Sequence, residues 1–439
     1  VPRSPYVALD LLEKAKSGTK AEGFAREDDA LSDLIAGDQF AASMYAFDLV
    51  QKRAKRPVGA PDKALAKPVT KVGIIGAGLM ASQFALLFVR KLQVPVLITD
   101  LDQARVDKGV AHIHDEIGKL EAKGRLDGDT ANKLRSLVRG TTDKSEYADC
   151  DFVIEAVFEE VGVKQQVFAE IEAIVSDDTI LATNTSSLSV AEIGSKLAHP
   201  ERLVGFHFFN PVAVMPLIEI VRTDATTDAA LSTAFVVAKG LGKNAVLTAD
   251  APGFVVNRLL AKVMGEAARA VYEGTPLLTV EKAFAPLGLP MSPFQLIDLV
   301  GWKVAAHVQD TMAAAFPDRY FASENFHQLA ELPKVVEKDK SGKVTGWTKA
   351  AQRVLVTGNA PVSEAEILDR VQSGLAREMK IMLDEGVVPE VEDIDLCLIL
   401  GAGWPFIDGG ASPYLDRVGA SDSAFGATFH QPPIRGIGA

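Results

Sequence analysis

One histidine and one carboxylate, separated by twelve positions, could together move a proton. His207 lies among aromatic residues in Gly205-Phe206-His207-Phe208-Phe209-Asn210-Pro211, and Glu219 follows inside an apolar run. Charged side chains are seldom fully buried unless they are paired, so we expect Glu219 to bind His207. A carboxylate that binds one imidazole nitrogen fixes the tautomer and raises the basicity of the other nitrogen. The pair therefore predicts a general base that can take a proton from an alcohol.

An isolated histidine in an apolar strand is more often a core residue with a structural partner. Residues 203–206 and 217–221 are apolar and are typical of buried strands, so His207 and Glu219 would lie on neighbouring strands. The choice between a structural pair and a catalytic pair depends on what the rest of the chain places beside them.

A glycine-rich turn joins an apolar strand to a helix earlier in the chain. Residues 71–75 form the strand, Gly76-Ala77-Gly78-Leu79-Met80-Ala81 follows, and an apolar helical pattern continues to Arg90. Gly76 permits a tight turn, and Gly78 lets the backbone approach a pyrophosphate at the helix N-terminus. Ala81 supplies the small residue that the third position of this fingerprint needs for helix–strand packing. The pattern predicts a dinucleotide-binding site.

A second strand, 94–99, ends in Asp100, which lies 24 residues after Gly76. An acid at about this distance binds the ribose 2′-hydroxyl of the cofactor. Because a carboxylate disfavours a 2′-phosphate, we expect NAD in preference to NADP.

Two further turns follow buried strands of the same region. The strand 151–157 ends in Phe158-Glu159, and the strand 179–183 is followed by Asn184-Thr185-Ser186-Ser187. In open parallel sheets, ligands bind beyond the carboxyl ends of the strands, so both turns are placed to face the cofactor. Capping of the next helix accounts for Ser187 or Ser189, but it does not account for Ser186.

The composition narrows the class of protein. The chain has 439 residues, 48% of them hydrophobic, and a net charge of −12, which argues against nucleic acid as the main partner. No apolar run is long enough for a transmembrane helix. The two cysteines, Cys150 and Cys397, have neither metal-ligand spacing nor a disulfide framework. We therefore expect a cytoplasmic protein without a bound metal.

The chain divides into four predicted domains. Residues 1–68 are an amphipathic helical segment that ends in a Pro-, Gly- and Lys-rich linker, and 69–250 alternate between strands and helices. The remainder is helical and contains an internal repeat, so we expect two helical domains, 251–345 and 346–439. The repeated motifs are Glu273-Gly274 with Glu385-Gly386, Gly288-Leu289-Pro290 with Gly403-Trp404-Pro405, and residues 296–301 with 414–419.

Taken together, the spaced motifs resemble those of L-3-hydroxyacyl-CoA dehydrogenase. The residues that match are Gly76 to Ala81, Asn184 to Ser187, His207 to Pro211, Glu219, and Pro252-Gly253-Phe254-Val255-Val256-Asn257-Arg258. The doubled helical part is similar to the dehydrogenase portion of multifunctional fatty-acid β-oxidation enzymes of the trifunctional α-subunit type. In those enzymes an enoyl-CoA hydratase domain precedes the dehydrogenase, and residues 1–68 resemble the end of that domain and its linker helix.

This resemblance implies a fold and a reaction. The fold is an α/β Rossmann-type domain followed by a duplicated all-α domain similar to the C-terminal domain of 6-phosphogluconate dehydrogenase. The reaction is the NAD-dependent oxidation of L-3-hydroxyacyl-CoA to 3-oxoacyl-CoA, with an acyl-CoA as substrate and a thiolase subunit as the usual partner. One departure is Ala81, where members of the family mostly have glycine, and we expect a small effect on cofactor affinity.

The resemblance also implies a role for each site residue. His207 takes the hydroxyl proton of the substrate while the hydride passes to NAD, and Glu219 orients His207. Ser186 and Asn257 hydrogen-bond the reacting oxygen and its surroundings, and with His207 they contact the substrate. The residues expected at the cofactor are Gly76, Gly78, Leu79, Met80, Asp100, Ala156, Val157, Glu159, Lys164, Asn184, Ser186 and Asn210.

Two other functions compete with this interpretation. A β-hydroxyacid or sugar-acid dehydrogenase has the same plan, but it usually has a lysine base on the helical domain, and no obvious motif after Gly253 supplies one. A catalytically retired relative could serve as a binding or structural protein. The presence of His207, Glu219, Ser186 and Asn257 argues against that alternative.

Overall fold

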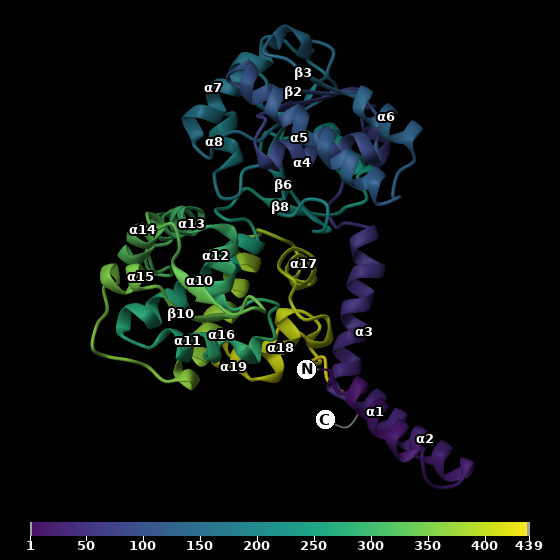
Figure 1. Ribbon diagram of the computed structural model, residues 1–439, viewed down its shortest axis with the longest axis vertical. Coiled ribbons are helices and arrows are strands. Elements are labelled where there is room, and N and C mark those ends of the chain that lie inside the picture. The colour runs from purple at the N-terminus through teal and green to yellow at the C-terminus, as the bar shows by residue number, and fades with distance from the viewer. Residues whose placement is uncertain (1, 437–439) are drawn as a thin grey trace. The chain divides into compact units, whose positions relative to one another are not determined.

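The computed structural model describes residues 2–436 and divides them into two compact units (Figure 1). One unit holds residues 54–254 and contains a large sheet. The other combines the N-terminal helices, up to Arg53, with the chain from Val255 onward, and it is mostly helical.

The sheet has eight strands in the order β3-β2-β1-β4-β5-β6-β7-β8. The first six positions repeat the strand order of a Rossmann fold, and these six strands are parallel to one another. β7 then runs antiparallel to β6, and β8 runs parallel to β7. The strands are β1 (Val72–Ile75), β2 (Val96–Thr99), β3 (Val138–Gly140), β4 (Phe152–Glu155), β5 (Ile180–Thr183), β6 (Leu203–Phe208), β7 (Leu217–Arg222) and β8 (Asn244–Ala249).

Helices cover both faces of this sheet, which is why its central strands are apolar along their whole length. One core cluster lies under α4, α5, α6 and α9, and a second lies under α7 and α8. The helices of this unit are α4 (Leu79–Lys91), α5 (Gln103–Ala122), α6 (Gly128–Ser136), α7 (Val161–Glu172), α8 (Val190–Gly194) and α9 (Asp228–Gly240), with short 3₁₀ turns at η2 (Lys63–Leu65), η3 (Lys144–Tyr147) and η4 (Pro200–Arg202).

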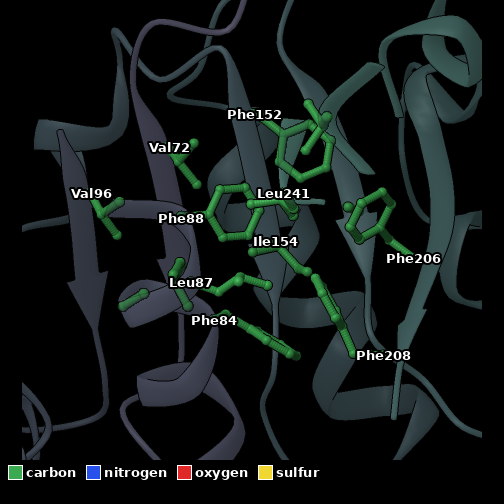
Figure 2. Close-up of a cluster of buried hydrophobic side chains, with 14 of the residues drawn as sticks. Val72, Phe84, Leu87, Phe88, Val96, Phe152, Ile154, Phe206, Phe208 and Leu241 are labelled. Atoms are coloured by element: carbon green, nitrogen blue, oxygen red, sulfur yellow. The ribbon is translucent and has the colours of Figure 1, made fainter. Parts of the chain in front are cut away.

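Phenylalanine rings join the first helix of the dinucleotide fold to the strand that contains His207 (Figure 2). Phe84 of α4 packs on Phe208 of β6 with ring centroids 4.5 Å apart, and Phe208 contacts Phe206 at 5.3 Å. Phe206 in turn meets Phe152 of β4 at 5.5 Å. These buried contacts hold the glycine turn and β6 in one rigid core.

The helical unit contains the internal repeat that the sequence predicts. The paired glycines Gly274 and Gly386, Gly288 and Gly403, and Gly301 and Gly419 all have positive φ, so both copies need glycine at matching points. The contact between the copies is reciprocal, because Gly288 faces Pro405 while Gly403 faces Pro290.

One small hairpin interrupts the otherwise helical second half. It encloses the charged loop 338–343 between β9 (Val336–Lys338) and β10 (Val344–Trp347), and Lys338 forms an ion pair with Asp298 at 2.5 Å. The helices of this half are α10 (Val256–Glu273), α11 (Leu277–Ala283), α12 (Pro293–Val300), α13 (Trp302–Ala315), α14 (Glu324–Ala330), α15 (Lys349–Val354), α16 (Glu364–Asp384), α17 (Val391–Cys397), α18 (Ala411–Arg417) and α19 (Ala420–Phe425), with short helical turns at η5 (Ala285–Leu287), η6 (Leu398–Ala402) and η7 (Phe406–Asp408).

The N-terminal segment is shared between the two units. It forms α1 (Ser4–Lys14), α2 (Lys20–Ala36), α3 (Asp38–Gln51) and the turn η1 (Arg53–Lys55). Arg53 binds the carboxylate of Asp393 through two hydrogen bonds of 2.7 and 2.8 Å, whereas the backbone N–H of Lys67 donates to Thr233 of the sheet unit at 2.9 Å. The expectation of one domain over 1–68, followed by three more, remains a prediction. No helix within residues 2–436 is long and apolar enough to cross a membrane.

Candidate active site

The antiparallel pairing of β6 and β7 places His207 directly opposite Glu219. Side chains opposite each other in such a pair lie on the same face of the sheet. The Nδ1 atom of His207 lies 2.7 Å from Oε2 of Glu219, and the two residues are 5% and 0% exposed. The contact expected from the sequence is therefore present, and it is buried.

The tautomer of this histidine follows from its partner. A carboxylate can only accept a hydrogen bond, so Nδ1 of His207 carries a proton and Nε2 is left as the basic nitrogen of the neutral ring. The ring is packed by Phe209 and Phe254, at centroid distances of 4.5 and 5.7 Å. These contacts restrict rotation of the imidazole, so its basic nitrogen has a fixed direction.

The glycine turn has the geometry that a pyrophosphate requires. Gly76 has φ +110°, and a Cβ there would lie 2.6 Å from the carbonyl oxygen of Ala156, so only glycine fits. A Cβ on Gly78 would meet no atom within 4 Å, which leaves open space at the start of α4. Unpaired N–H groups and the helix dipole make this position suitable for an anion. Leu79 is exposed at the same point.

Asp100 is tied to the glycine turn. Its carboxylate accepts hydrogen bonds from the backbone N–H groups of Ala77 at 2.7 Å and of Leu101 at 2.8 Å. Ala81 is fully buried beneath the turn, which agrees with the need for a small residue at that position. The expected cofactor residues Met80, Ala156 and Val157 are half-buried around the same edge. The glycine turn and Asp100 together fit a bound NAD.

Glu159 holds the turn that contains Ser186. Its Oε1 atom accepts hydrogen bonds from the hydroxyl of Thr185 at 2.7 Å, from the backbone N–H of Ser186 at 2.7 Å and from the hydroxyl of Ser186 at 3.2 Å. Burial alone would raise the pKa of the Glu159 carboxyl, but the Lys164 ammonium and these hydrogen bonds outweigh it and lower that pKa. Glu159 is therefore an anion that anchors the Ser186 turn.

Lys164 is almost completely buried, at 1% exposure. Its ammonium lies 2.7 and 2.8 Å from the two carboxylate oxygens of Glu155 and 3.1 Å from Oε2 of Glu159. The cofactor contact that the resemblance assigns to Lys164 stays a prediction. In the sheet unit its ammonium is directed at these two glutamates.

Sequence analysis missed Glu155. It ends β4 as a fully buried acid, and it lies in an apolar strand just as Glu219 does. The argument that identified a partner for Glu219 applies to it without change, because a buried carboxylate needs a counter-charge. That signal could have linked Glu155 to a lysine on the helix that follows.

The two asparagines assigned to the cofactor lie at the ends of neighbouring strands. Oδ1 of Asn184 accepts the backbone N–H of Phe208 at 2.9 Å, which connects the end of β5 to the end of β6. Asn210 is exposed beyond β6, and its Oδ1 accepts a hydrogen bond from Gln83 of α4 at 3.3 Å. Gln83 also accepts the N–H of Val212 at 2.8 Å, so it braces the connection after His207.

Asn257 is the one predicted site residue outside the sheet unit. It lies half-buried in the first turn of α10, in the helical unit. Its contact with the substrate and the individual roles of the other site residues stay predictions. Within residues 2–436, no group of three or more His, Cys, Asp or Glu side chains could hold a metal ion.

Comparison with known families follows the same division into an NAD-binding part and a helical part. Residues 71–251 match the family model for the NAD binding domain of 3-hydroxyacyl-CoA dehydrogenase, and residues 253–346 match the model for its C-terminal domain.

Individual relatives agree with these matches. The fatty acid oxidation complex subunit alpha of Pseudomonas putida is 33% identical over 433 residues, which cover 94% of this chain and 60% of that protein. This chain thus spans three-fifths of the length of that curated relative. Among solved structures, FadB2 from M. tuberculosis is 32% identical with a TM-score of 0.57, covering 68% of this chain and 100% of that one.

A second solved structure is named as a dehydrogenase of a 3-hydroxyacyl-CoA. The (S)-3-hydroxybutyryl-CoA dehydrogenase PaaH1 from Ralstonia eutropha is 30% identical with a TM-score of 0.56, covering 60% of this chain and 93% of that one. The matched domains, the Rossmann strand order and the glycine turn with its acid all agree with these similarities. The chain belongs to the 3-hydroxyacyl-CoA dehydrogenase family of NAD-dependent oxidoreductases.

Proposed function

We propose that this chain oxidises L-3-hydroxyacyl-CoA to 3-oxoacyl-CoA with NAD as the hydride acceptor. The observation that carries the proposal is the buried contact of 2.7 Å between Nδ1 of His207 and Glu219, at the edge of a Rossmann sheet whose glycine turn fits NAD. A base and a dinucleotide site at one sheet edge are the two parts that alcohol oxidation needs.

In the proposed reaction, Nε2 of His207 accepts the proton of the 3-hydroxyl group. The carboxylate of Glu219 stabilises the imidazolium that results. The bound NAD supplies the acceptor for the hydride that leaves the same carbon, so the alcohol loses two electrons and two hydrogens. Ser186 and Asn257 hydrogen-bond the reacting oxygen and its surroundings; both roles rest on the family resemblance.

Cofactor preference follows from Asp100 in this proposal. Its carboxylate stands beside the glycine turn, where the adenosine ribose of a dinucleotide lies in Rossmann folds. A negative charge there accepts a hydrogen bond from a 2′-hydroxyl and repels a 2′-phosphate. We therefore propose NAD as the working cofactor.

The relatives suggest a larger assembly. We propose that the natural protein also has enoyl-CoA hydratase activity, that it works with a thiolase subunit, and that it is cytoplasmic. The P. putida relative is named as a subunit of a fatty acid oxidation complex, which supports an assembly. The hydratase activity and the thiolase partner rest on the family resemblance, and the two buried cysteines suit a reducing compartment. Isolation of the natural protein, followed by its intact mass and an assay for hydration of an enoyl-CoA, tests this part.

A direct assay tests the proposed reaction. The protein is mixed with acetoacetyl-CoA and NADH, and the loss of NADH absorbance is followed; we expect rapid turnover with NADH and little with NADPH. Free 3-hydroxybutyrate with NAD is the matched control. Oxidation of the free acid without turnover of the CoA thioester would favour a β-hydroxyacid dehydrogenase. NADH binding without turnover of either compound would favour a retired relative.

A further inference from the structure

Glu155 is a fully buried carboxylate at the same sheet edge as the Ser186 turn. It accepts the backbone N–H of Val157 at 2.6 Å and the hydroxyl of Thr183 at 2.7 Å, and its two oxygens bind the Lys164 ammonium at 2.7 and 2.8 Å. These bonds satisfy the acid in an environment where an unpaired charge would be strongly unfavourable.

The two glutamates bind different partners. Glu155 gives both oxygens to Lys164, whereas Glu159 gives only Oε2, at 3.1 Å. The other oxygen of Glu159 accepts all three hydrogen bonds that come from Thr185 and Ser186. Two carboxylates and one ammonium thus form a chain that runs from the buried end of β4 to Ser186.

We propose that Glu155 is a positioning residue for the reaction, acting through Lys164 and Glu159 on Ser186. Because Glu155 neutralises Lys164, Glu159 keeps one oxygen on the Ser186 turn and holds the serine hydroxyl in place. Without the charge of Glu155, the buried ammonium would draw both oxygens of Glu159 toward itself, since charge-assisted hydrogen bonds are the stronger ones. This inference rests on the proposed function, in which Ser186 binds the reacting oxygen.

The first test is the isosteric variant Glu155→Gln in the full chain. We expect kcat with acetoacetyl-CoA to fall about tenfold or more, within the range that positioned catalytic groups contribute. The pH dependence of kcat/KM should not move, because His207 and Glu219 lie on other strands. A variant that melts earlier but keeps the kcat of the wild type would overturn the proposal.

A double-mutant cycle with Ser186→Ala tests whether Glu155 acts through Ser186. If it does, Glu155→Gln should cost less than about twofold in kcat once Ser186 is already alanine, because coupled residues are non-additive. Independent, multiplied losses would show that Glu155 works by another route, and the proposal would fail.

Amide hydrogen exchange gives a readout that does not depend on turnover. Glu155→Gln should speed exchange in the segment 184–188, where the N–H of Ser186 is bound to Glu159. Unchanged protection of this segment would contradict the proposal even if the wild type failed to turn over acetoacetyl-CoA. Failure of the proposed function and failure of the inference are therefore distinguishable.

Glu172→Gln is the matched control. Like Glu155, Glu172 is a largely buried acid with a cationic partner, but it lies at the end of α7 and its partner is Arg202, at 3.3 Å. It also accepts hydrogen bonds from the backbone N–H groups of Ala198 and His199. We expect this variant to lose stability while kcat and the exchange of 184–188 stay at wild-type values. A drop in kcat equal to that of Glu155→Gln would show a general effect of removing a buried charge and would overturn the proposal.

Thr183→Val keeps the test open if Glu155→Gln fails to fold. It removes one hydrogen bond to Glu155 and changes no charge. We expect a smaller loss of kcat in the same direction, together with faster exchange in 184–188. Wild-type behaviour in both measurements would count against the proposal.

Discussion

At the scale of single residues, the site depends on acids that each bind a specific cation or N–H group. Glu219 binds Nδ1 of His207, Glu155 binds Lys164, and Asp100 binds the N–H of Ala77. In each case a buried or half-buried carboxylate fixes the direction of a partner at the carboxyl edge of the sheet.

The proposed base can be tested by His207→Gln, which keeps the size of the side chain and removes its basicity. We expect kcat to fall by about 10²–10⁴-fold, the typical contribution of positioned acid–base catalysis. NADH should still bind, because the glycine turn and Asp100 are untouched; fluorescence titration checks this. Turnover near the wild-type rate would exclude His207 as the base.

Glu219→Gln should also depress turnover, and an unchanged pH–rate profile in that variant would argue against the pair.

The contact between His207 and Glu219 could be predicted from the sequence because each residue is a polar exception in an apolar strand. Glu155 has the same signature, but its partner lies on a helix, and the direction of Lys164 depends on the packing of α7 against β4. The asparagine at 184 was expected near the cofactor, whereas its hydrogen bond to Phe208 depends on the spacing of β5 and β6. The distance between these two strands cannot be predicted from a single sequence.

At the scale of elements, β6 and β7 set the geometry of the base. Gly205 lies two residues before His207, opposite Val221. A Cβ on Gly205 would lie 2.5 Å from Cβ and 2.7 Å from Cγ2 of Val221, so the two strands approach more closely than any larger residue allows.

Gly205→Ala should therefore destabilise the sheet unit by about 1–3 kcal/mol, the usual cost of overpacking. It should also lower kcat, because separation of the strands lengthens the contact between His207 and Glu219. Thermal melting and kinetic assays measure the two effects. Gly162→Ala in α7 is the control, since a Cβ there meets no atom within 4 Å, and we expect it to be neutral or slightly stabilising. Equal behaviour of the two variants would contradict the argument.

A second element-scale feature joins α3, α17 and α18. Asp395 of α17 is fully buried and accepts hydrogen bonds from the hydroxyls of Tyr45 and Ser412 and from the N–H of Ser412. Burial raises the pKa of Asp395 to about 7, against the opposing effect of these hydrogen bonds. The folded protein therefore holds a proton on Asp395 that the unfolded chain releases at lower pH.

This linkage predicts that the contribution of Asp395 is largest in acid and is lost as the pH rises to about 7. At about 1.4 kcal/mol per pKa unit, it falls by up to about 3 kcal/mol between about pH 5 and pH 7. Asp395→Asn mimics the protonated form, because both hydroxyl partners can rotate. We expect this variant to melt above the wild type at neutral pH and close to it at pH 5. Because the two proteins are compared at each pH, titrating groups outside this cluster cancel. His430 binds the Ser412 hydroxyl at 2.8 Å and belongs to the cluster, so the comparison is repeated with His430→Gln in both proteins. A difference in melting temperature that is the same at both pH values would contradict this prediction.

Several elements could be predicted from their patterns, and others could not. The helix expected from the glycine turn to Arg90 agrees with α4, and the strands expected around His207 and Glu219 agree with β6 and β7. α6 and β3 were not predicted, because 128–136 are mostly polar and β3 is a three-residue edge strand with one buried residue. Such short edges are specified by their neighbours, not by a hydrophobic pattern of their own.

At the scale of the whole molecule, a buried ion network holds the two helical copies together. Arg258 of α10 is fully buried and donates to Glu378 of α16 at 2.6 Å, and Arg319 reaches the same oxygen at 3.1 Å. Both arginines also pair with the partly exposed Glu385, at 2.7 and 3.5 Å, so two carboxylates of the other copy of the repeat hold them.

Glu378→Gln should cost the helical unit about 3 kcal/mol, the low end of the range for breaking a buried pair, because Glu385 still pairs with both arginines. The sheet unit contains the glycine turn, so we expect NADH still to bind. Calorimetry and NADH titration measure the two outcomes. Glu364→Gln is the control: Glu364 pairs with Lys282 on the surface at 2.9 Å, and exposed pairs contribute only about 0–1 kcal/mol. A melting temperature like that of the wild type for Glu378→Gln would contradict the role of the network.

The division of the chain at Arg53 shows where sequence reasoning stops at this scale. The Pro- and Gly-rich tract predicts a connection, but the contact that ends the helical part joins Arg53 to Asp393, 340 residues away. Local composition gives no information about such a distant partner. The internal repeat was visible because both copies need glycines with positive φ at matching turns.

The hydrogen bond between Asp100 and Ala77 affects any attempt to engineer the protein toward NADPH. Replacing the acid by glycine or alanine would remove the repulsive charge, but it would also release the loop that receives the diphosphate. Asparagine keeps an oxygen for the Ala77 amide and adds a donor suited to an extra phosphate. Redesign of coenzyme choice should therefore start from asparagine at position 100.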